Sequence, residues 1–284
     1  MPCRPRGTRL SVPGSVHAVC QDGEVNPASD SSFQNSSPFT RSLLAPNPGP
    51  MSLDGTNSYI IAGPDARGVV IVDPGPLDES HLAALAAAGT VELVLITHRH
   101  KDHTEASVRF HELTGAPVRA ADPVQCHGGE PLRAGEVIQA AGVEIRVLAT
   151  PGHTSDSVCF HLPGDGPDGS VLTGDTILGR GTTVLDYPDG RLGDYLSSLD
   201  TLESLGPATL LPAHGPVLPA VDAVCREYRA HREMRLDQIR EALARLGAQA
   251  GVQAVTDAVY PDVDPSVRWA AETSVAAQLD YLRA

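Results

Sequence analysis

Residues 97–103 read Thr-His-Arg-His-Lys-Asp-His and directly follow the apolar run Val-Glu-Leu-Val-Leu-Ile at 91–96. An apolar run that is rich in β-branched residues and bounded by polar ones is typical of a buried strand. Histidine and aspartate are usual ligands of zinc and related metals. Side chains at i and i+2 point the same way in an extended segment, so His98 and His100 are expected to bind one metal. Asp102 and His103 follow a bend and can serve a second metal. A histidine-rich surface loop without metal is the alternative.

The length and composition limit the class of protein. The chain has 284 residues and a formal net charge of −14, which suits one large domain with a small appendage or extension. Tight non-specific binding of nucleic acid needs a basic surface, so the acidity argues against it. Five scattered cysteines without a CxxC pair favour reduced thiols and a cytoplasmic protein. We expect no membrane-spanning helix, because no apolar run reaches about 18 residues.

The pattern divides the chain into three parts. Residues 1–45 are rich in Pro, Ser and Gly without a sustained period, so we expect a mostly irregular N-terminal extension. Strands and helices interleave over 46–220, and several strands are hairpin neighbours. This order predicts an α+β fold with mixed sheets and outer helices, a layered αββα sandwich. Residues 221–284 read as a small helical unit with closely spaced Arg and Glu.

The predicted elements follow from hydrophobic periodicity and turn residues. Strands are predicted within 55–61 and at 69–72, 91–96, 118–120, 137–140, 143–148, 157–162, 170–173 and 209–211. Helices are predicted at 78–88, 104–114, 194–205, 222–247, 256–260 and 265–282.

Three further fragments place a possible metal ligand after a predicted strand. These ligands are His153, Asp175 and His214. A single histidine at a strand end is more often structural. Four strand-end sites in the order HxHxDH…H…D…H supply five histidines and two aspartates. That set suffices for two divalent metals with an open position for water.

Four motifs in this order resemble the metallo-β-lactamase superfamily over residues 46–220: THRHKDH (97–103), TPGHT (150–154), TGD (173–175) and PAHG (212–215). The resemblance implies a four-layer αββα sandwich and two divalent metal ions, preferably Zn²⁺. It implies that His98, His100 and His153 bind the first metal, that Asp102, His103 and His214 bind the second, and that Asp175 bridges them.

Asp102 refines the resemblance. An aspartate here, with histidine at the other terminal positions, resembles the glyoxalase II, ribonuclease Z and β-lactamase-like protein 2 branches. β-Lactamases with a cysteine at the third strand end differ. Residues 47–59 and 179–184 also resemble relatives of β-lactamase-like protein 2. Those relatives carry a C-terminal winged-helix-like unit, which the resemblance implies for 221–284.

A mechanism follows from this resemblance. A hydroxide held by two metals would attack a carbonyl or a phosphorus centre, and Asp102 would be a catalytic residue that orients it. Thr154, Ser155 and Asp73 are candidates for fixing the imidazole tautomers, with plain turn chemistry as the alternative. Asn57 is a candidate substrate-binding residue, with an Asx-type turn as the alternative.

We therefore predict a metal-dependent hydrolase of a small-molecule ester or thioester. A phosphodiesterase or endoribonuclease acting on single-stranded RNA is the main alternative. Such an enzyme needs a positive groove, whereas acidic residues are interspersed among the arginines of 222–247. Iron-dependent persulfide oxidation and a non-catalytic binding module are less favoured. No membrane partner is expected, and the sequence leaves the oligomeric state open.

Overall fold

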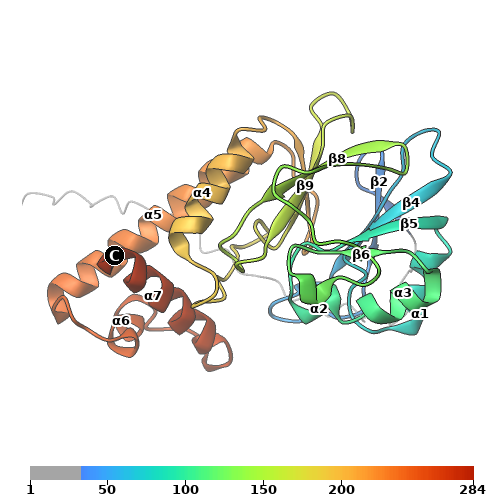
Figure 1. Cartoon of the computed structure of the whole chain (residues 1–284). Coiled ribbons are helices and arrows are strands. Elements are labelled where there is room, and N and C mark those ends of the chain that lie inside the picture. Colours follow the sequence, from blue (N-terminus) through green and yellow to red (C-terminus); the bar gives the residue numbers. More distant parts are fainter. Residues whose placement is uncertain (1–32) are drawn as a thin grey trace, which may run out of the picture. The chain divides into compact units, whose positions relative to one another are not determined.

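Two mixed β-sheets form the centre of the computed structural model, which describes residues 33–284 (Figure 1). The first sheet has the order β1-β2-β3-β4-β5-β6, formed by Gln34–Asn35, Thr40–Leu44, Asn57–Ile61, Gly68–Val72, Thr90–Leu95 and Val118–Arg119. The second has the order β11-β10-β9-β8-β7, formed by Thr209–Pro212, Ser170–Gly174, Val158–Leu162, Val143–Ala149 and Val137–Ala140. Strands β4, β5 and β6 are parallel, as are β10 and β11, and the other pairs are antiparallel.

Apolar clusters on both faces of each sheet produce four layers. Helices α1 (Glu79–Ala86) and α3 (Ser107–Thr114) bury Leu82, Leu85 and Phe110 against the first sheet. Helices α4 (Leu192–Glu203) and α5 (Val221–Leu246) cover the second sheet. A third cluster, which includes Leu95 and Phe160, fills the space between the sheets. The predicted αββα sandwich is therefore confirmed.

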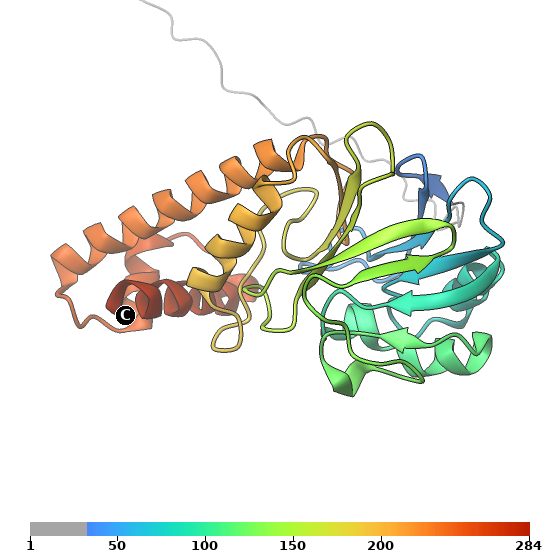
Figure 2. The same cartoon turned by 45° about the horizontal axis from the view of Figure 1, so that its top comes forward.

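The C-terminal unit is helical. Helices α5, α6 (Val252–Val259) and α7 (Arg268–Arg283) pack around Ile239, Val255 and Val275 (Figure 2). A 3₁₀ turn, Pro265–Val267, leads into α7. Residues 221–284 are all described and contain no strand, so this unit lacks the β-wing of a winged helix.

The structure differs from the expected irregular N-terminal extension over residues 34–44. Strands β1 and β2 lie in this stretch, and β2 pairs with β3 from Thr40 opposite Ile61 to Leu44 opposite Asn57. The short polar stretch Thr-Arg-Ser lacks a clear period, which explains why the sequence pattern missed β2. Residues 1–32 lie outside the described part. The boundaries at 46–220 and 221–284 remain predictions.

Helix boundaries show smaller differences. The helix expected at 104–114 is two helices, α2 (Lys101–Thr104) and α3, and α6 begins before the predicted residue 256. Within the described residues, no helix has both the length and the apolar character needed to cross a bilayer.

Candidate metal centre

Loops after strands of both sheets bring the seven predicted ligands together. Strand β5 leads into the segment with His98, His100, Asp102 and His103; His153 follows β8, Asp175 follows β10 and His214 follows β11. The two sheets meet at this edge, where the Val158 amide donates to the Thr97 carbonyl at 2.9 Å. Gly174 has φ +50°, and a Cβ there would lie 2.7 Å from the Thr97 Cβ. Only glycine permits this close approach beside Asp175.

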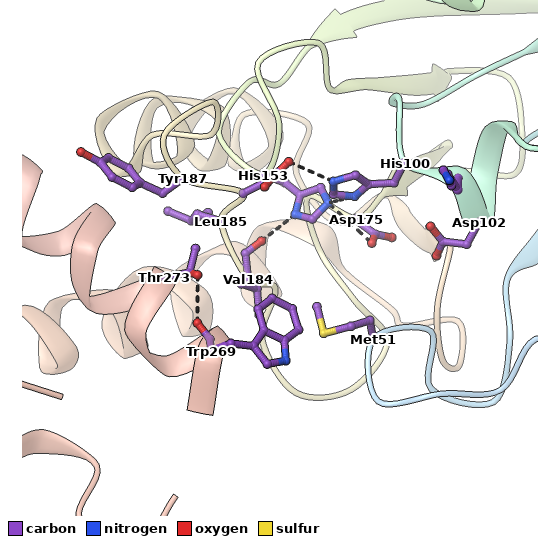
Figure 3. Close-up of a pocket in the computed structure, with 12 residues that line it drawn as sticks. Met51, His100, Asp102, His153, Asp175, Val184, Leu185, Tyr187, Trp269 and Thr273 are labelled. Carbon is purple, nitrogen blue, oxygen red and sulfur yellow. Dashed lines mark hydrogen bonds and ion pairs between the residues drawn. The ribbon is translucent and has the colours of Figure 1, made fainter. Parts of the chain in front are cut away.

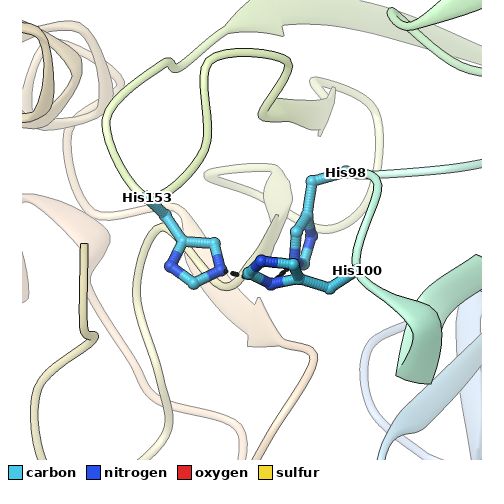
Figure 4. Close-up of side chains that lie close together, drawn as sticks. All are labelled: His98, His100 and His153. Carbon is cyan, nitrogen blue, oxygen red and sulfur yellow. Dashed lines mark hydrogen bonds between the residues drawn. The ribbon is translucent and has the colours of Figure 1, made fainter. Parts of the chain in front are cut away.

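His98, His100 and His153 form a first cluster of ring nitrogens (Figure 4). The His100 Nδ1 lies 3.1 Å from the His98 Nε2 and 3.1 Å from the His153 Nε2. Metal–nitrogen bonds of 2.0–2.1 Å in a tetrahedron separate neighbouring ligand atoms by about 3.3–3.4 Å. Both distances are close to this spacing, and all three nitrogens lie within 4.8 Å of one another, so they could bind one cation.

Asp102, His103 and His214 form a second cluster. The Asp102 Oδ2 lies 3.2 Å from the His214 Nε2 and 3.5 Å from the His103 Nε2. The spacing again suits one small cation.

Asp175 lies between the clusters and presents one oxygen to each. Its Oδ2 is 3.7 Å from the His153 Nε2, while its Oδ1 is 3.3 Å from the His214 Nε2 and 3.6 Å from the His103 Nε2. The Asp175 Oδ1 and the Nε2 atoms of His103 and His214 are buried without hydrogen-bond partners. Leaving such atoms unpaired is costly, and a bound cation would satisfy them. The donor set thus fits two divalent ions.

The opposite nitrogen of each imidazole has a defined partner. The partners are the Thr97 Oγ1 for His98 (3.1 Å), the Asp186 Oδ2 for His100 (3.2 Å), the Asp73 Oδ2 for His103 (2.9 Å), the Val184 carbonyl for His153 (2.6 Å) and the Gly55 carbonyl for His214 (3.0 Å). A carbonyl or carboxylate can only accept, so the nitrogen facing it carries the proton. In a neutral imidazole the nitrogen facing the cluster then keeps its lone pair, as a metal ligand requires.

Asp73 organises the start of the histidine segment. This buried residue adopts a positive φ and accepts hydrogen bonds from the Thr97 backbone amide at 2.8 Å and from the Thr97 Oγ1 at 2.7 Å, as well as from His103. Of the three predicted positioning residues, Asp73 contacts a candidate ligand. Thr154 instead bonds to Ser157, and Ser155 bonds to Asp189.

Burial and charge affect the clusters differently. Burial lowers the pKa of His98 and His153, which favours neutral imidazoles in the first cluster. Burial also opposes the charge on His214, but Asp175 and Asp102 outweigh it and raise the pKa of His214 to about 9. Both environments favour a cation, the first through neutral donors and the second through nearby carboxylates.

Asn57 holds the loop that carries His214. Its Nδ2 donates to the carbonyls of Pro212 at 3.0 Å and Gly215 at 2.9 Å. These bonds occupy the amide group, and the predicted contact with a substrate remains a prediction.

Sequence reasoning missed the contacts of Arg99. This arginine of the histidine segment pairs with Asp186 and, at 2.8 Å, with Asp189. These bonds tie the histidine segment to the loop after β10. No sequence signal marked this pairing, because the partners are about ninety positions apart.

A pocket of about 490 Å³ adjoins the two clusters (Figure 3). Its charged and ligand side chains are His100, Lys101, Asp102, His153, Asp175 and Asp186. Its other lining residues are Met51, Val184, Leu185, Tyr187, Trp269 and Thr273, of which the last two belong to α7. The volume suits a small organic ligand.

Comparisons with known proteins agree with this arrangement. Residues 51–214 match the family model described as the metallo-beta-lactamase superfamily. An atrochrysone carboxyl ACP thioesterase from Aspergillus chevalieri is 35% identical over 219 residues, which cover 74% of this chain and 67% of that protein.

Two solved structures extend the comparison. A metallo-beta-lactamase family protein from Thermus thermophilus matches with a TM-score of 0.65 and 26% identity, covering 87% of this chain and 93% of the other. The protein TTHA1623, solved in a di-iron-bound form, matches with a TM-score of 0.51 and 26% identity, covering 63% of this chain and 93% of the other.

Proposed function

Because the chain belongs to the metallo-beta-lactamase superfamily, we propose that this metal-dependent hydrolase cleaves the thioester bond of a small acyl compound. The observation that carries the proposal is the position of Asp175, whose two oxygens face two separate clusters of ligand atoms. A thioester is favoured over other acyl bonds because a relative 35% identical to this chain is named a thioesterase. The branch within the superfamily remains a prediction.

We assign the metal ligands as the sequence motifs predict. His98, His100 and His153 would hold one ion, Asp102, His103 and His214 the other, and Asp175 would contact both. Two divalent ions in such a site supply Lewis acidity and lower the pKa of water. Zn²⁺ is the proposed metal because the donors are mainly imidazoles with tetrahedral spacing. Iron is the alternative, since a similar protein is known in a di-iron form.

Asp102 is the proposed catalytic residue. Its side chain is 32% exposed, compared with 10% for Asp175, and it lines the pocket. The Asp102 Oδ2 faces His103 and His214, which leaves Oδ1 to accept a hydrogen bond from the attacking water. This bond would orient the water toward an acyl carbonyl in the pocket.

The paired arginines of α5 support a small substrate over RNA. Arg226 pairs with Asp222 at 3.0 Å, and Arg240 pairs with Asp237 at 2.7 Å. Arg229 likewise pairs with Asp200. Phosphate binding would compete with these carboxylates, so these three arginines are poor candidates for an RNA-binding groove. A cytoplasmic location remains part of the proposal, and the free thiols of Cys159 and Cys225 agree with it.

A side-by-side assay tests the function. Purified protein would be analysed for metal and then given acyl-thioesters, a lactone, bis-para-nitrophenyl phosphate and single-stranded RNA. We expect two metal equivalents and thioester hydrolysis, which Asp175→Ala abolishes and Asp102→Ala reduces by at least a hundredfold in kcat. The control Asp168→Ala changes an exposed carboxylate and should behave like the wild type. Metal-dependent cleavage of RNA alone would contradict the proposal.

A further inference from the structure

One wall of the pocket comes from outside the sandwich. Trp269, at the start of α7, lines the pocket and is 52% exposed. Met51, from the loop before β3, lines it as well and is 43% exposed. Large apolar side chains that remain this exposed beside a cavity retain surface that a ligand can cover.

The rest of this wall is also apolar. Val184, Leu185 and Tyr187, from the loop after β10, join Trp269 and Met51, and these five residues are here called the apolar wall (Figure 3). The candidate metal ligands lie at one part of the pocket, so a thioester whose reacting carbonyl is near them has room to place its acyl group against the apolar wall. Lys101 is the one cationic side chain among the lining residues, apart from the histidines.

Packing against neighbouring helices fixes the position of α7, which carries Trp269. Helix α7 buries Val275 and Leu279 against α5 and α6, and it buries Ala277 in the cluster shared with α4. An ion pair of 3.8 Å between Arg191 and Asp280 adds a contact with the residue that precedes α4. The helix that carries Trp269 is therefore placed beside the pocket before any substrate arrives, so binding need only order the exposed indole side chain.

We propose that Trp269 and Met51 select thioesters whose acyl group is a flat aromatic ring system; this rests on the proposed thioesterase function. An indole ring presents a flat face that stacks on another aromatic ring with a gain of about 0.5–1.5 kcal/mol beyond surface burial. A methionine sulfur adapts to irregular shapes and makes favourable contacts with aromatic rings. Flexible alkyl chains would cover the same surface without the stacking gain and with a larger loss of conformational entropy.

Binding of free carboxylates tests the recognition without catalysis. The metal-loaded protein would be titrated with 2-naphthoate and hexanoate by calorimetry. Tryptophan emission would also be followed, because Trp269 is the single tryptophan of the chain. We expect 2-naphthoate to bind at least tenfold more tightly than hexanoate and to change the emission. Trp269→Ala should reduce this preference about tenfold, and Trp269→Phe should restore part of it.

Kinetics with matched thioesters test whether Trp269 and Met51 select aromatic acyl groups. The kcat/KM ratio of 2-naphthoyl- to hexanoyl-N-acetylcysteamine should fall about tenfold in Trp269→Ala and less in Met51→Ala. Tyr281→Ala removes another exposed aromatic residue of α7 that does not line the pocket, and it should leave the ratio unchanged.

The outcomes separate the two proposals. An equal acyl preference in the wild type and Trp269→Ala, with intact thioester hydrolysis, would overturn the aromatic selection alone. Binding of 2-naphthoate that depends on Trp269, without hydrolysis of any thioester, would overturn the proposed function and support the aromatic site. The Trp269→Phe variant keeps an aromatic ring at this position, and thermal melting shows whether it is folded. Recovery of the acyl preference in this variant would show that Trp269→Ala lost stacking rather than structure.

Discussion

Individual side chains could be predicted where they carry their own chemistry. Each of the seven candidate ligands is a histidine or aspartate after an apolar run, so the residue type and its place gave the signal. Most of the groups that orient them carry no such signal, although Asp73, which contacts His103, was a candidate from the sequence. The Val184 and Gly55 carbonyls accept hydrogen bonds from His153 and His214. Every residue has a backbone carbonyl, so only the folded chain shows which two lie next to these histidines.

Asp73 offers a test of this orientation at the second cluster. Asp73→Asn removes the negative charge opposite His103 and weakens the bond that fixes its tautomer. We expect the affinity for the second metal to fall 10–100-fold, with a smaller change at the first site. Competition with a chelator measures both affinities. The exposed Asp65→Asn is the control, and equal losses at both sites would contradict this role.

His81 should make stability depend on pH. Burial lowers the pKa of His81 to about 4, and its Nε2 lies 2.9 Å from the Ser58 Oγ. The unfolded chain takes up a proton near the ordinary pKa of 6.5, while the folded chain resists it, so stability is lost as the pH falls from about 6.5 toward 4. Between pH 7 and pH 5 the loss from this residue should be about 2 kcal/mol.

Denaturant unfolding of the wild type and His81→Gln, with the same metal present, checks this dependence. The variant should be less stable at pH 7 but should lose about 2 kcal/mol less than the wild type between pH 7 and pH 5. Parallel pH curves for the two proteins would show that His81 does not carry the effect.

Elements with a strong period were predicted well, and those stabilised by distant contacts were not. The alternation of Val143, Ile145 and Val147 matches the buried positions of β8. Strand β2 lacks a sustained hydrophobic period, and its pairing with β3 is supported by a loop far along the chain. Asp165, between β9 and β10, accepts hydrogen bonds from the Phe39 amide at 2.7 Å and the Thr40 Oγ1 at 3.2 Å.

Removing this anchor should destabilise the sandwich. Asp165 is buried and also accepts from Ser37 and Ser170, so Asp165→Ala leaves four donors without their acceptor. We expect a loss of about 2–4 kcal/mol in the free energy of unfolding. Asp168→Ala, an exposed carboxylate in the same turn, should change it by less than about 0.5 kcal/mol. Similar values for the two variants would contradict the anchoring role.

Helix α5 supports the first cluster through Arg232. This arginine is 4% exposed, lies over the Tyr195 ring at 4.9 Å and donates to the Thr183 carbonyl at 2.6 Å. Thr183 precedes Val184, whose carbonyl holds His153. Arg232→Met should therefore lower affinity for the first metal about tenfold.

Metal titration with matched variants measures this support. Arg232→Lys should retain more affinity than Arg232→Met, because it keeps a cationic donor. Arg240→Met, at an exposed position of the same helix, should have no effect. The prediction fails if Arg232→Met folds normally and binds the first metal as tightly as the wild type.

At the scale of the whole molecule, element order predicted the layers but not the pocket. Interleaved strands and helices with hairpin neighbours have few ways to bury their apolar faces, and the four-layer sandwich is one of them. The approach of α7 to the metal clusters depends on packing between helices far apart in sequence. The sequence predicted a helix at 265–282, in which Trp269 and Thr273 are four residues apart and so share a face, but it did not predict that both line the pocket.

The segment from Thr183 to Leu185 links three parts of the molecule within a few residues. Arg232 holds its first residue, His153 is bonded to its second, and its third lines the pocket. A ligand that orders this segment would therefore change the affinity for the metal by some factor. By linkage, the bound metal would change the affinity for the ligand by the same factor. The concentration of free metal would then change the apparent dissociation constant of the substrate.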